Sequence, residues 1–89
     1  MNDKQEAYLK KMEAQLNEWS AEIDLLKARA EKAGTEAEVE YQDRLETLRT
    51  RESAARAKLA ELKQSGADAW ESLKSGVESA MADLREGLK

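Results

Sequence analysis

The chain has 89 residues, 15 Lys and Arg against 19 Asp and Glu, a net charge of −4, and no Cys, His, Pro or Phe. Without Cys there is no disulfide framework or thiolate chemistry, and without His the commonest metal ligand and general base are missing. The length allows one small domain with a thin core, so self-association is expected. We expect no enzymatic activity, no cofactor, no metal site and no small-molecule substrate.

Charge and hydropathy also limit the partners and the location of the protein. No apolar run approaches the roughly 18 residues that span a bilayer, and the first six residues lack the order of a signal peptide, so we expect a cytoplasmic protein. The basic residues concentrate between positions 44 and 63, but they fall on several helical faces with acids between them. This pattern disfavours nucleic-acid binding, which needs a basic stripe.

Helix formers dominate the whole chain, and one apolar stripe runs through its first two thirds. Ala, Leu, Glu, Lys, Arg and Gln favour helix, while β-branched and aromatic residues are scarce. The stripe alternates steps of three and four, which is typical of a coiled-coil seam. It comprises Leu9, Met12, Leu16, Trp19, Ile23, Leu26, Ala30, Ala33 and Ala37, then Tyr41 and Leu45 after two successive steps of four, then Leu48, Ala55, Leu59 and Leu62, with Glu52 in one core slot.

Gly34 leaves two architectures open. The heptad phase from Ala33 to Ala37 continues across it, and one Gly inside a helix costs only about 1 kcal/mol. These observations favour a continuous helix over about residues 3–64. The alternative is a turn, because Gly34 is followed by Thr35 and Glu38 at the spacing of a capping box. A turn here and another at Gly66 would give a three-helix bundle.

A second break is expected near Gly66, followed by a shorter amphipathic helix over about residues 68–88. Asp68 and Glu71 have the spacing of an N-terminal cap. The apolar stripe of this helix comprises Trp70, Leu73, Val77, Met81, Leu84 and Leu88, and one of its edges carries small residues. Such an edge fits close packing on another helix better than immersion in lipid.

Several segments carry a resemblance to a known family. They are residues 16–26 (LNEWSAEIDLL), 40–41 (EY), 59–63 (LAELK) and 69–77 (AWESLKSGV). Together they resemble a family of short bacterial coiled-coil domain proteins, some linked by name to stress responses and some likened to apolipoproteins. The resemblance implies a helical fold and a stress-response setting, and it brings no catalytic or binding residues.

The sequence thus predicts an all-α fold: a single helical coiled-coil domain over residues 1–89, with a long helix, a shorter C-terminal helix and homo-oligomeric assembly. The predicted function is non-enzymatic self-assembly or interaction, linked to a bacterial stress response. The alternatives are binding to a lipid or membrane surface through an amphipathic helix, and capture of a heterologous helix. The predicted oligomer interface comprises Leu9, Met12, Leu16, Trp19, Ile23, Leu26, Leu45, Leu48, Leu59, Leu62, Trp70, Leu73, Val77, Met81 and Leu84.

Overall fold

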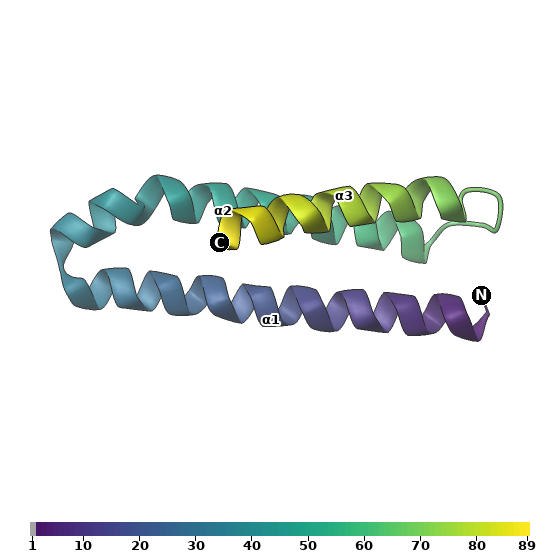
Figure 1. The fold of residues 1–89 in the computed structure, drawn as a ribbon, viewed down its shortest axis with the longest axis horizontal. Coiled ribbons are helices and arrows are strands. Elements are labelled where there is room, and N and C mark those ends of the chain that lie inside the picture. The colour runs from purple at the N-terminus through teal and green to yellow at the C-terminus, as the bar shows by residue number, and fades with distance from the viewer. Residues whose placement is uncertain (1) are drawn as a thin grey trace.

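The computed structural model describes residues 2–89 and confirms the all-α prediction. Three helices follow one another: α1 (Asp3–Ala33), α2 (Thr35–Lys63) and α3 (Trp70–Leu88), and no strand occurs within the described range. They form an elongated bundle of 50 × 18 × 18 Å in which α2 runs antiparallel to both α1 and α3 (Figure 1).

The predicted continuous helix over residues 3–64 is wrong, because the chain reverses at Gly34. This residue has φ 111° and ψ 176°, a backbone conformation that is essentially restricted to glycine. Its N–H donates to the Glu31 carbonyl at 3.4 Å, and its own carbonyl accepts from the Glu38 N–H at 3.1 Å. The turn lets the seam of α1 bury against α2 in the same molecule, which a straight helix cannot do. The three-helix alternative therefore describes the fold.

The helix caps differ from those that the sequence predicted at Thr35 and Asp68, neither of which forms a side-chain cap. Asn2 and Gln5 form a reciprocal capping box at the start of α1. Gly34 is the N-cap of α2 and Ala69 that of α3, and neither helix has a side-chain cap. The predicted break near Gly66 is confirmed, although α3 begins at Trp70 rather than near residue 68.

The core lies where α2 packs between its two neighbours. Both α1 and α3 run along α2, whereas they touch each other at only a few points. The apolar core comprises Leu9, Leu16, Ile23, Leu48, Ala55, Leu59, Leu62, Trp70, Val77, Met81 and Leu84. Because α3 is much shorter than the α1–α2 hairpin, it stops well before the turn at Gly34 (Figure 1).

Close approach of α3 to α2 depends on a small residue at one point. A Cβ added to Gly87 would lie 2.9 Å from Leu48 Cδ2 and 3.0 Å from Arg51 Nη1. Arg51 also donates to the Asp83 carbonyl at 2.8 Å, so its side chain is anchored across the two helices. The small-residue edge that the sequence showed on this helix is thus used to pack against α2.

Candidate interaction surfaces

Most residues of the predicted oligomer interface lie in the core of the single chain. Leu9, Leu16, Ile23, Leu48, Leu59, Leu62, Trp70, Val77, Met81 and Leu84 are buried by the chain's own helices. Met12, Trp19, Leu26, Leu45 and Leu73 are half-buried at the margin of this core. The periodicity identified the buried face correctly, and the use of that face between chains stays a prediction.

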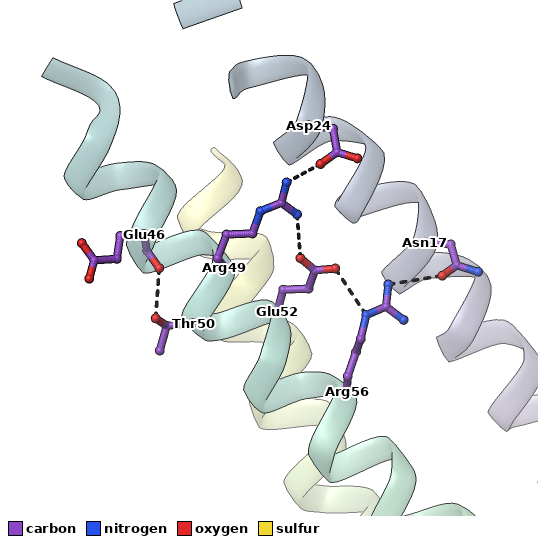
Figure 2. Close-up of polar contacts among 7 residues, drawn as sticks. All are labelled: Asn17, Asp24, Glu46, Arg49, Thr50, Glu52 and Arg56. Carbon is purple, nitrogen blue, oxygen red and sulfur yellow. Dashed lines mark hydrogen bonds and ion pairs between the residues drawn. The ribbon is translucent and has the colours of Figure 1, made fainter. Parts of the chain in front are cut away.

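A polar cluster spans α1 and α2 around Glu52, the charged residue that the sequence placed in a core slot. The Glu52 side chain is held between two arginines of its own helix: Arg49 Nη1 donates to Oε1 at 3.0 Å, and Arg56 Nε donates to Oε2 at 3.3 Å (Figure 2). Glu52 is only 8% exposed, and it is the one charged residue of the described chain that is buried. Two guanidinium groups thus neutralise a carboxylate in the apolar seam.

The two arginines also reach across to α1. Arg49 pairs with Asp24, and Arg56 Nη2 donates to Asn17 Oδ1 at 3.2 Å (Figure 2). Further along the same pair of helices, Lys63 Nζ lies 3.6 Å from a carboxylate oxygen of Glu13. All three bridges have the same polarity, with donors on α2 and acceptors on α1. They therefore favour a single antiparallel alignment of the hairpin, because a slipped alignment would separate them.

The electrostatics of the cluster favour the charged forms of Glu52 and Arg49. Burial alone would raise the pKa of Glu52, but hydrogen bonds from Ser20, Arg49 and Arg56 outweigh it, and the pKa lies below its ordinary value. The hydrogen bond to Asp24 raises the pKa of Arg49 against the opposing effect of burial. A carboxylate with a lowered pKa and occupied oxygens is a weak general base. The arrangement aligns the two helices.

A groove between α1 and α3 forms the second notable surface. Its volume is about 590 Å³, and its lining comes from both helices: Tyr8, Lys11, Met12, Gln15, Trp19, Glu78, Met81, Ala82 and Arg85. Tyr8, Met12 and Trp19 are half-buried, so their side chains still offer apolar surface to a partner. The groove lies where α1 and α3 both pack on α2 but make few contacts with each other.

Tyr8 organises one end of this groove. Its ring packs edge-on against Trp70, with centroids 6.0 Å apart and planes at 71°. Lys74 Nζ lies 5.1 Å from the Tyr8 ring centroid, and the Tyr8 hydroxyl donates to Glu78 at 3.4 Å. Burial and the neighbouring Glu78 carboxylate raise the pKa of Tyr8 to about 12. Our sequence reasoning missed Tyr8, although it precedes Met12 by four residues and so lies on the same helical face.

The structure also bears on metal binding and on membrane crossing, for the part of the chain that it describes. Within residues 2–89, no group of three or more carboxylate, thiol or imidazole side chains is placed to hold a metal ion. Within the same range, no helix has the length and apolarity that crossing a membrane requires. Protein-family models, curated proteins and solved structures gave no match to this chain.

Proposed function

We propose that this chain is a non-enzymatic interaction protein that works by self-assembly through its helical faces. The observation that carries the proposal is the groove between α1 and α3, where half-buried aromatic and methionine side chains lie between charged edges. Aromatic residues, Met and Arg are enriched at protein interfaces. Met12 and Trp19 belong to the apolar seam, and α2 and α3 cover them only in part.

The resemblance to short bacterial coiled-coil proteins supports a role in a stress response. Assembly suits such a role, because the extent of association follows protein concentration and solution conditions. The two alternatives place different demands on the structure. Lipid binding would require α3 to leave α2 and expose Val77 and Leu84, both fully buried here. Capture of a foreign helix would require the groove to remain empty when the protein is alone in solution.

Sedimentation velocity combined with a light-scattering mass, over a hundredfold dilution, tests the proposal. We expect an oligomer at high concentration that dissociates into a folded, moderately elongated monomer on dilution. A monomer throughout the range would contradict self-assembly. Flotation with anionic and neutral vesicles, followed by circular dichroism, separates the lipid alternative. Protein that remains unbound with unchanged helicity would exclude it.

A further inference from the structure

Three charged residues, Lys11, Glu78 and Arg85, line the groove, and a fourth, Glu18, follows Lys11 along α1 outside the lining. On α1, Lys11 and Glu18 are seven residues apart, and on α3 the same spacing separates Glu78 and Arg85. Seven residues are close to two helical turns, so both members of each pair lie on the same side of their helix. Within residues 2–89, neither Lys11 nor Arg85 has a carboxylate within salt-bridge distance. The order of charge is positive then negative on α1, and negative then positive on α3.

The two pairs lie at the same height along the bundle. Lys74 lies over Tyr8, which fixes the alignment of α3 beside α1. From this alignment, the midpoint of the α1 pair, between Ala14 and Gln15, falls within about one helical turn of the midpoint of the α3 pair, between Met81 and Ala82. One line across the groove therefore passes close to both midpoints.

From this coincidence we infer that a second copy of the chain docks face to face on the groove, antiparallel, about a two-fold axis along that line. The inference rests on the proposed self-assembly and specifies its surface and symmetry. The rotation places α1 on α1 and α3 on α3 of the partner copy. Each Lys11 then meets the other copy's Glu18, and each Glu78 meets the other copy's Arg85. A two-fold axis makes every such contact twice, so four charge pairs form from two sequence pairs.

The apolar floor of the groove fits the same arrangement. The α1 and α3 helices of both copies would form a four-helix layer, with the two α2 helices outside it. Met12 and Trp19 are half-buried in one chain, and in that layer Met12 of each copy would lie near Trp19 of the other. The contact face extends about 28 Å along α3 and about 20 Å across two helices. This footprint is near the lower end of stable interfaces, which bury about 800 Å² per partner, so a micromolar dimer is expected.

A parallel stacking of the same faces is the main competitor. It would place α1 on the partner's α3, and opposite charges would again meet, Lys11 with Glu78 and Glu18 with Arg85. All four helices of the layer would then point the same way, which aligns their dipoles unfavourably. In the antiparallel arrangement, the helix dipoles oppose one another across the interface. We therefore commit to the antiparallel form and use charge reversal to distinguish the two.

The test mixes two single variants, Lys11→Glu and Glu18→Lys. Alone, each variant places like charges against each other twice per dimer, and we expect dimerisation to weaken about tenfold. In an equimolar mixture, the Glu introduced at position 11 meets the Lys introduced at position 18, and the two unchanged residues also pair. Sedimentation velocity of the mixture is therefore expected to recover the wild-type dimer. An intramolecular effect of either substitution cannot produce this recovery, because mixing leaves each chain unchanged.

Matched controls and contrary outcomes make the test decisive. Lys10→Glu makes the same charge change on the adjacent α1 face, which also carries Asn17 and Asp24, and is expected to leave dimerisation within twofold of wild type. Recovery when Lys11→Glu is mixed with Glu78→Arg, but not with Glu18→Lys, would overturn the antiparallel form. A dimer whose dissociation constant is unchanged by all these substitutions would overturn the groove interface while leaving self-assembly intact. A wild-type monomer would overturn both proposals. Circular dichroism confirms that each variant is folded.

Discussion

The two ends of the α1–α2 hairpin differ in how they are covered. Over most of its length the hairpin carries α3 and buries large side chains such as Leu16, Leu48 and Leu62. The tip, residues 27–44, lies beyond the C-terminal end of α3 (Figure 1). At that end of α3, the Lys89 carbonyl accepts a hydrogen bond from Arg44 Nη2 at 3.4 Å. Here Ala30 is the buried apolar residue, and Val39 is 66% exposed.

The difference shows what the third helix contributes. A two-helix hairpin buries only a narrow strip of each helix, and small Ala side chains add little apolar area to it. The covered body adds a second interface along α2, so each large side chain there is enclosed from two sides. Local stability is therefore expected to fall from the body towards the tip. The predictions below test this gradient.

The largest effect is expected from a cavity in the body. Leu16 is fully buried, so Leu16→Ala is expected to lower the free energy of unfolding by about 3 kcal/mol, from lost apolar burial and the remaining cavity. Urea unfolding followed by circular dichroism measures the change. A loss below about 1 kcal/mol would show that the body is loosely packed and would remove the contrast with the tip.

A smaller loss is expected from Gly34→Ala at the turn. The φ of 111° and ψ of 176° are strained for any residue with a Cβ, so the hairpin should lose about 1–3 kcal/mol. The same substitution favours helix by about 1 kcal/mol, so it also promotes the straight form of residues 3–63. Two straight chains can cover each other's seams, so size exclusion is expected to show a domain-swapped dimer. An unchanged melting temperature and mass would contradict this account.

The turn at Gly34 also shows how far the sequence alone could predict the fold. Heptad phase assigns residues to a face, and it identified the buried residues on all three helices. The phase is the same whether α1 and α2 form one helix or two facing helices, so it could not decide the turn. The deciding factor is tertiary. Folding back buries the seam within one molecule, whereas a straight helix must find a partner at a concentration-dependent cost.

The candidate surfaces were predictable to different degrees. The sequence placed Glu52 in a core slot of the seam, and the structure confirms that this side chain is buried. The bridges from Arg49 and Arg56 to α1 join residues 25 and 39 positions apart, so they depend on the turn and could not be derived before it. The groove could likewise not be predicted, because periodicity does not show how α1 and α3 lie relative to each other on α2.

The buried carboxylate gives a prediction of about 1 kcal/mol. Glu52→Gln removes the charge of the group that accepts hydrogen bonds from two guanidinium groups. We expect this substitution to lower the free energy of unfolding by about 1 kcal/mol at pH 7. Because the folded-state pKa of Glu52 is lowered, the folded chain binds fewer protons than the unfolded chain in the acid range. The stabilisation is therefore complete above the unfolded pKa of about 4.3 and is lost as the pH falls through the folded pKa.

Urea unfolding of wild type and Glu52→Gln at several pH values between 7 and 3 measures this contribution. The difference between the two curves is expected to shrink as the pH decreases below about 5. Glu61→Gln, at an exposed position of the same helix, is the control and is expected to show a much smaller difference at every pH. A Glu52→Gln difference that stays constant or grows on acidification would show that the carboxylate does not stabilise the fold as an ion.

The smallest effect is expected at the tip, from Val39→Ala. The side chain is 66% exposed, so its truncation removes little buried area, and the higher helix propensity of Ala offsets even that loss. The free energy of unfolding is expected to change by less than about 0.5 kcal/mol. A loss above 1 kcal/mol that is independent of protein concentration would mean that the chain itself covers the tip. A similar loss that appears only at high protein concentration would mean that a second copy covers it, and would place an assembly contact at the tip as well as at the groove.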